Sequence, residues 1–124
     1  MIQIDTHVAV WLAGRRERAL SAAARRIVAT EELQISPLVA MELETLWQGG
    51  KLRSEPRRVL AAVESWFGVS WSEASFASVT EAARTFAWTR DPFDRLIVAN
   101  AMADGVRLLT GDELILRHFR DAVW

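Results

Sequence analysis

Short apolar or β-branched runs alternate with longer amphipathic stretches along the whole chain. The short runs predict strands at residues 2–4, 33–35, 69–71, 106–109 and 122–124. The longer stretches carry helical periodicity and predict helices at residues 6–13, 19–29, 37–48, 55–67, 73–86, 92–104 and 112–119. Strand, helix and strand in succession favour a mostly parallel sheet with helices on both faces. We therefore expect the α/β class, with one three-layer α/β/α domain over residues 1–124.

Three of the expected helices begin at a proline that follows a capping side chain. The capping residues are Ser36, Ser54 and Asp91. Proline suits the first helical turn because its missing N–H has no partner there, and a serine or aspartate oxygen accepts a bond from the free N–H groups that follow. These signals predict where the helices start.

The composition indicates a reducing compartment. The chain has 124 residues, 51% of them apolar and none of them cysteine, so disulfides, thiolate nucleophiles and cysteine-bound zinc are excluded. The basic residues near the N-terminus follow the apolar stretch, the reverse of a secretory signal, and no apolar run is long enough for a membrane span. We expect a cytoplasmic protein that does not contact membranes.

The charges indicate no whole-molecule attraction for nucleic acid, because 15 basic and 16 acidic residues leave a formal net charge of −1. All the basic residues except Lys51 are arginines, and the GGKL segment around Lys51 lacks the spacing of a phosphate-binding loop. The arginines form three loose clusters: Arg15, Arg16 and Arg18; Arg25 and Arg26; Arg53, Arg57 and Arg58. We favour solvated helix faces for these clusters over phosphate contacts.

Three aspartates are expected at one edge of the sheet. Asp5 directly follows the first strand, and Asp112 follows the strand VRLL by three residues. Asp94 lies in the first turn of a helix that runs antiparallel to the strands, so this turn also opens at their carboxyl ends. Ligands of parallel sheets bind at that edge.

Glu42 joins them by helical geometry. It falls within about 60° of the centre of the apolar face of its helix, whereas Glu44 points to the opposite side. Helical side chains lean toward the N-terminus, so Glu42 reaches back toward the strand ends.

Each acid also has an ordinary structural role open to it. Asp5, Asp91 and Asp112 suit helix N-caps, Asp94 suits the first turn of a helix, and Glu42 suits a buried pair with an arginine. Gathered at one edge, however, two carboxylates about 5 Å apart repel by roughly 3 kcal/mol at an effective dielectric of 20. A hard divalent cation, Mg²⁺ or Mn²⁺, offsets this repulsion and hydrolyses phosphodiesters by activating a bound water.

At these residues the sequence resembles the PIN domain, and more specifically the VapC-type toxins of bacterial toxin–antitoxin pairs. The similar segments are IDTHVAVWL, ISPLVAMELETLWQGGKL, RDPFDRLIVANAMADG and LLTGDELI, in the family's order. The resemblance implies a Mg²⁺-dependent endoribonuclease that leaves a 5′-phosphate and a 3′-hydroxyl, is inhibited by a VapB-type antitoxin and forms a homodimer. It implies that the catalytic and metal-binding acids are Asp5, Glu42, Asp94 and Asp112, with the Thr6 hydroxyl supporting Asp5. Asp94, and not Asp91, matches the family acid.

Four further side chains are assigned by position alone. Arg90 and Arg95 flank the Asp94 motif and suit RNA phosphates, although ion pairs with neighbouring acids fit equally. Trp11 and Trp47 suit a groove for an apolar antitoxin segment or a dimer partner.

Two further residues lie beside the acids in the sequence, His7 near Asp5 and Gly111 before Asp112. His7 suits orientation of substrate or water, but a packed or surface histidine is the commoner case. Gly111 suggests that Asp112 lies on a mobile turn and binds metal through water.

Two functions other than a nuclease use the same elements. A PIN-like module that has lost its chemistry would bind RNA or protein only. A receiver-like phosphoacceptor domain needs an aspartate at the end of its central strand and a lysine at the end of a late strand. It fits poorly here, because Ser72 follows the strand at 69–71 and Lys51 is remote from any late strand.

Overall fold

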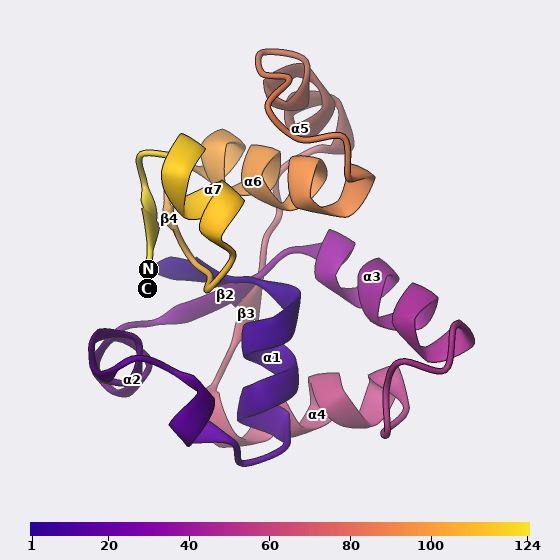
Figure 1. The fold of residues 1–124 in the computed structure, drawn as a ribbon, viewed down its shortest axis with the longest axis vertical. Coiled ribbons are helices and arrows are strands. Elements are labelled where there is room, and N and C mark those ends of the chain that lie inside the picture. The colour runs from indigo at the N-terminus through magenta and orange to yellow at the C-terminus, as the bar shows by residue number, and fades with distance from the viewer.

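A computed structural model describes all residues from 1 to 124 and shows a five-stranded sheet (Figure 1). The strands are β1 (Ile2–Ile4), β2 (Leu33–Ile35), β3 (Ser70–Trp71), β4 (Arg107–Leu109) and β5 (Ala122–Val123). Their order is β3-β2-β1-β4-β5, and every neighbouring pair is parallel. The prediction of a parallel α/β sheet is therefore confirmed, and it holds for all of the pairs.

Seven α-helices and one 3-10 helix surround the sheet. They are α1 (Thr6–Ala13), η1 (Glu17–Ala19), α2 (Ala22–Thr30), α3 (Pro37–Gln48), α4 (Pro56–Phe67), α5 (Phe76–Ala83), α6 (Pro92–Asp104) and α7 (Glu113–His118). In Figure 1, α6 and α7 lie on one side of the sheet and α1, α2 and α4 on the other, which gives three layers. None of the helices combines the length and apolar character needed to cross a membrane.

Serine caps account for the two largest differences in where helices start. Ser21 Oγ accepts a hydrogen bond from Ala24 N and starts α2 at Ala22, three residues later than predicted, while Ala19 belongs to η1. Ser75 Oγ accepts one from Ser78 N and starts α5 three residues later than predicted. The predicted cap at Ser54 is wrong, because the residue before α4 is Glu55 and its side chain makes no capping bond.

The core contains a polar cluster beneath α6. Gln3, in the middle of the central strand, is completely buried, and its Nε2 donates to Gln34 Oε1 at 2.8 Å and to Asp104 Oδ2 at 2.6 Å. Ser72 Oγ donates to the same carboxylate oxygen at 2.5 Å. These hydrogen bonds join α6 to β1, β2 and the residue that follows β3, while Gln3 Oε1 is buried without a hydrogen-bond partner.

Asn100 extends this cluster to the start of α3. Its Nδ2 donates to Ser72 Oγ at 2.7 Å, and its Oδ1 accepts from Ser36 Oγ at 2.5 Å. Ser36 also caps α3 by accepting from Leu38 N at 3.1 Å. The helix that carries Glu42 and the helix that carries Asp94 are thereby joined through a buried hydrogen bond.

We expect Ser36→Ala to lower the free energy of unfolding by about 2–3 kcal/mol, because it removes a helix cap and leaves a buried amide oxygen unpaired. Ser75→Ala is the matched control, since Ser75 caps an exposed helix start in the same manner, and it should cost only about 1 kcal/mol. Urea unfolding measures both variants. Equal losses would contradict the role given to the bond between Ser36 and Asn100.

Candidate metal centre

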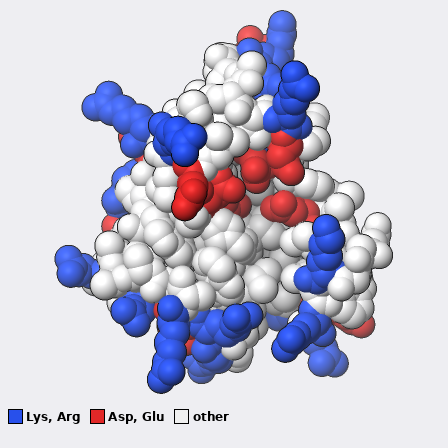
Figure 2. Space-filling model, in the orientation of Figure 1, with Lys and Arg blue, Asp and Glu red and all other residues white.

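The four predicted acids line one small cavity at the carboxyl ends of the strands. The cavity has a volume of about 230 Å³, and Asp5, Glu42, Asp94 and Asp112 all contribute to its wall. Figure 2 shows the acidic side chains gathered on this face, with basic side chains around them. The fold thus brings together the residue after β1, residues of α3 and α6, and the β4–α7 turn, and the first and last of these acids are more than a hundred positions apart in the sequence.

Asp5 is the most buried of the four, with 3% of its surface exposed. Its Oδ1 accepts from Thr6 N at 2.7 Å, which caps α1, and its Oδ2 accepts from Thr110 Oγ1 at 2.6 Å. The capping role and the site role considered for Asp5 are therefore compatible. Thr110 was not predicted as a site residue, although its place two residues before Asp112 was a signal for it.

Asp112 lies on a turn that is held at several points. Its Oδ1 caps α7 by accepting from Ile115 N at 2.9 Å, and its own N–H donates to Thr110 Oγ1 at 3.1 Å. Gly111 N donates to His7 Nε2 at 2.8 Å. The expectation of a mobile turn is thus not supported, because two local hydrogen bonds hold the turn to itself and to α7, and a third joins it to His7.

Gly111 has a steric role in this turn. A Cβ at this position would lie 3.1 Å from the indole ring of Trp124. Glycine therefore lets the turn pass beneath the ring, which belongs to the residue after β5.

His7 lines the cavity, and groups at both of its ring nitrogens orient the imidazole. Because Nε2 accepts from Gly111 N, the ring proton is on Nδ1, which lies 3.5 Å from Asp5 Oδ2. The ring meets Trp11 edge-on, with centroids 4.9 Å apart. His7 is therefore a half-buried, packed residue that also faces Asp5.

A fifth carboxylate belongs to the site. Glu42, Asp91 and Asp94 each offer an oxygen, and these atoms lie within 4.8 Å of one another. Asp91 also caps α6 by accepting from Phe93 N and Asp94 N through Oδ1. Sequence reasoning placed Asp91 in the cap alone, whereas the structure places it in both the cap and the cluster.

Burial and the neighbouring charges raise the pKa of two of these acids. Burial, followed by the charges of Asp91, Asp5, Asp112 and Glu42, raises the pKa of Asp94 to about 7. The pKa of Glu42 is also raised, chiefly by burial, while the Thr6 hydroxyl opposes the rise. Perturbed carboxyls grouped in a cleft are typical of functional sites.

The flanking arginines differ from each other. Arg95 Nε donates to Ala83 O at 2.8 Å and its Nη2 to Phe86 O at 2.7 Å, so the guanidinium holds the end of α5. The expected contact of Arg95 with RNA is therefore not supported, and neither is an ion pair with a neighbouring acid. Arg90 is exposed and remains a candidate.

The two tryptophans assigned to a partner also differ. Trp11 is half-buried against His7 and Trp124 and lines the acidic cavity. Trp47 lies near the end of α3 with 39% of its surface exposed. Of these two tryptophans, only Trp47 presents a large exposed apolar surface.

The donor set fits a hard divalent cation. All of the acidic groups offer oxygen, and no lysine or arginine forms an ion pair with any of them. The Thr6 hydroxyl is buried in the same wall and makes no regular hydrogen bond. Uncompensated carboxylates with oxygen donors only are the ligands that Mg²⁺ and Mn²⁺ prefer.

Comparison with known proteins gives one family. The model of the PIN domain family matches residues 2–120. "Ribonuclease VapC22" of Mycobacterium tuberculosis is 30% identical over 94% of this chain and 91% of its own length. The solved structure of VapBC2 from Rickettsia felis, bound to a DNA fragment from its promoter, contains a chain with the same fold; the TM-score is 0.66 at 16% identity, covering 99% of this chain and 96% of that one.

We expect Asp94→Asn to stabilise the metal-free protein above neutral pH. The raised pKa means that, between about pH 4 and pH 7, the folded state holds a proton that the unfolded state has lost, so the free energy of unfolding falls as pH rises through this window. The substitution removes this loss. It should raise the free energy of unfolding by about 1–2 kcal/mol near pH 8, after allowance for solvent screening, and change it little near pH 4.

Urea unfolding in the presence of a chelator measures this effect. Asp121→Asn, which changes an exposed acid outside the cavity, serves as the control. If Asp94→Asn is no more stable than the parent protein near pH 8, the raised pKa of Asp94, and with it the burial and crowding of this carboxylate, is contradicted.

Proposed function

The chain belongs to the PIN domain family, and from that premise we propose that it is a Mg²⁺-dependent endoribonuclease that acts as the toxin of a type II toxin–antitoxin pair. One observation carries the proposal: carboxylates from separate segments surround a single cavity and form no ion pair with any lysine or arginine. The ribonuclease name of the M. tuberculosis relative supports the same reaction class. The products are an RNA 5′-phosphate and a 3′-hydroxyl.

Asp5, Glu42, Asp94 and Asp112 are the residues proposed to hold the metal. A bound divalent cation would lower the pKa of a water ligand and neutralise charge on the phosphate and the leaving oxygen. Asp91 adds a further carboxylate beside Glu42 and Asp94. The donors therefore suffice for one or two ions.

Neighbouring side chains prepare Asp5 for this role. Thr110 Oγ1 and Thr6 N bind its two oxygens, and His7 Nδ1–H faces Oδ2, so the carboxylate keeps one orientation. Such supporting hydrogen bonds orient metal ligands and raise their affinity for the ion. Thr6 contributes through its N–H, and its hydroxyl faces Glu42 instead of Asp5.

The partners of the proposed toxin are its RNA substrate, a VapB-type antitoxin and a second copy of the chain. The R. felis structure is of a VapBC pair, which supports an antitoxin partner. Trp47 is proposed as the main apolar contact, and Trp11 as a contact within the acidic cavity. RNA as substrate places the proposed activity in the cytoplasm.

We expect Glu42→Gln and Asp94→Asn each to reduce RNA cleavage by at least about 100-fold, because both remove a proposed metal ligand. Glu44→Gln, two residues along the same helix and outside the cavity, should cleave at the parental rate. The assay follows labelled tRNA and rRNA in Mg²⁺, in Mn²⁺ and with a chelator. Cleavage that survives Asp94→Asn or the chelator would contradict the proposal, and absence of cleavage by the parent protein in both metals would leave a binding module.

We expect Trp47→Ala to weaken binding of the cognate antitoxin by about 10-fold or more, as is usual for a large aromatic anchor. Trp71→Ala is the control, since Trp71 is exposed to the same extent, 38% against 39%, but lies on the edge strand β3. Titration calorimetry of each variant with the antitoxin measures the change. Unchanged affinity for Trp47→Ala would remove this residue from the proposed interface.

A further inference from the structure

A second cavity adjoins the acidic one and carries the opposite charge. It has a volume of about 550 Å³ and lies between the end of α1, the α3–α4 loop and α4. Four basic side chains line it and no acidic one does: Arg16, Lys51, Arg53 and Arg58. Figure 2 shows an uncharged hollow below the acidic cluster with basic side chains along its margin.

These four cations have no partners within the protein. The ion pairs of the chain with arginine are Arg15–Glu17, Arg84–Glu81 and Arg107–Glu31, and none includes a residue of this cavity. All four side chains are exposed. Like charges that surround one hollow without a counter-charge are expected to bind anions.

The arrangement arises only in the folded chain. Arg16 follows α1, whereas Arg53 and Arg58 belong to a different cluster at the start of α4. Contact between α1 and α4 brings the two clusters to one cavity. The interpretation of these arginines as separate solvated faces is therefore incomplete for this part of the surface.

The cationic and acidic cavities adjoin each other. Three residues line both of them: Val10, Lys51 and Leu52. An RNA strand that leaves the carboxylates past Lys51 therefore reaches the basic cavity next. A strand with one phosphate at a metal centre places its next phosphates nearby. The remaining wall is aliphatic, with Val59 and Ala62, and has no aromatic ring for base stacking.

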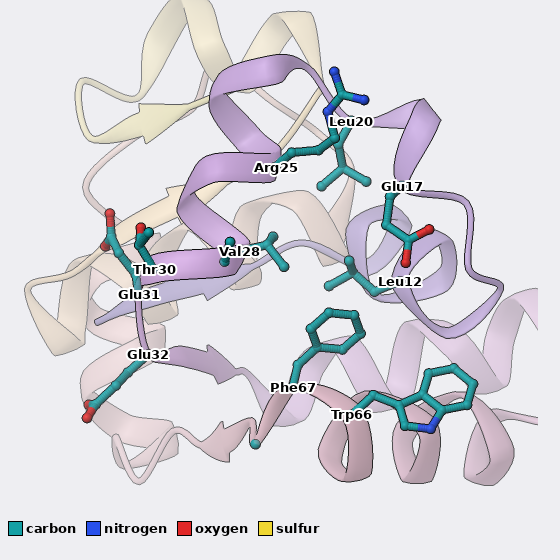
Figure 3. Close-up of a pocket in the computed structure, with 12 residues that line it drawn as sticks. Leu12, Glu17, Leu20, Arg25, Val28, Thr30, Glu31, Glu32, Trp66 and Phe67 are labelled. Carbon is teal, nitrogen blue, oxygen red and sulfur yellow. The ribbon is translucent and has the colours of Figure 1, made fainter.

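The largest cavity of the molecule has a different character. It has a volume of about 680 Å³ and lies between α1, α2 and α4, where Trp66 and Phe67 face Leu12 and Val28 (Figure 3). Its charged residues are mostly acidic, and none of its lining residues lines the acidic cavity. It therefore lacks the charge and the position needed for an RNA strand.

We propose that the cationic cavity holds the backbone phosphates of the RNA strand beside the cleaved bond, an assignment that rests on the proposed nuclease function. Arg16, Lys51, Arg53 and Arg58 bind these phosphates without reading the bases, because phosphate contacts fix position and carry no sequence information. The strand then runs from the carboxylates toward α4.

The test measures binding of a short fluorescein-labelled oligouridylate by fluorescence anisotropy over a range of salt concentrations. Asp94→Asn is present throughout, so that the RNA is not cut. Each phosphate contact in a single strand contributes about 0.7 to the slope of log K against log salt. The triple variant Arg16→Gln, Arg53→Gln, Arg58→Gln should flatten this slope by about 2 and weaken binding by at least about 10-fold at low salt.

The matched control is Arg18→Gln, Arg25→Gln, Arg26→Gln, which removes three exposed and unpaired charges away from the cavity. Since the change in net charge is identical, any difference reports the location of the contacts. If the triple lowers the unfolding midpoint, Arg16→Gln and Arg53→Gln are measured singly, and each should flatten the slope by about 0.7.

Two results would overturn the proposal. In the first, the cavity triple binds the oligouridylate as the control triple does. In the second, it retains RNA binding but loses the antitoxin, which would assign the cavity to a protein segment. Cleavage of RNA by the parent protein in Mg²⁺ is measured separately, so failure of this subsite is distinguished from failure of the nuclease function.

Discussion

Mutual repulsion of carboxylates is the constraint on which the site depends. Four acidic side chains line one cavity of about 230 Å³, Asp91 lies beside two of them, and no arginine or lysine forms an ion pair with any of these acids. Burial is the largest cause of the raised pKa values of Asp94 and Glu42, and the charges of the neighbouring acids raise both further. A fold that maintains such an arrangement without an ion pair to Lys or Arg has to hold the acids by other means, and a divalent cation is the ligand that would relieve the repulsion.

Those means are hydrogen bonds to the backbone and to hydroxyl groups. Asp5, Asp91 and Asp112 each cap a helix, so their carboxylates are tied to N–H groups at positively polarised helix starts. Thr110 connects two of the segments, since it donates to Asp5 and accepts from the N–H of Asp112. The capping role and the metal role, which are alternatives when each residue is considered singly, are satisfied together by the same side chains.

Charge is segregated on the surface of a chain whose net charge is only −1. Acids surround one hollow, unpaired cations surround the next, and Lys51 lines both. A phosphodiester strand suits this pattern because it needs a divalent cation at the reacting phosphate and monovalent positive groups at the neighbouring ones. The local arrangement, and not the total charge, therefore determines how the protein attracts an anionic polymer.

Sequence periodicity alone determined the five strands, the helices that separate them and the edge at which Asp5, Asp94 and Asp112 lie, because parallel strands place all their carboxyl ends together. Helical periodicity added Glu42, because this residue falls on the apolar face of its helix and helical side chains lean toward the N-terminus. Only the tertiary structure decided that Asp91 joins the cluster, that Arg95 holds the end of α5 and that Arg16 meets Arg53 and Arg58. Those outcomes depend on side-chain direction and on packing between elements distant in sequence, and local pattern carries no information about either.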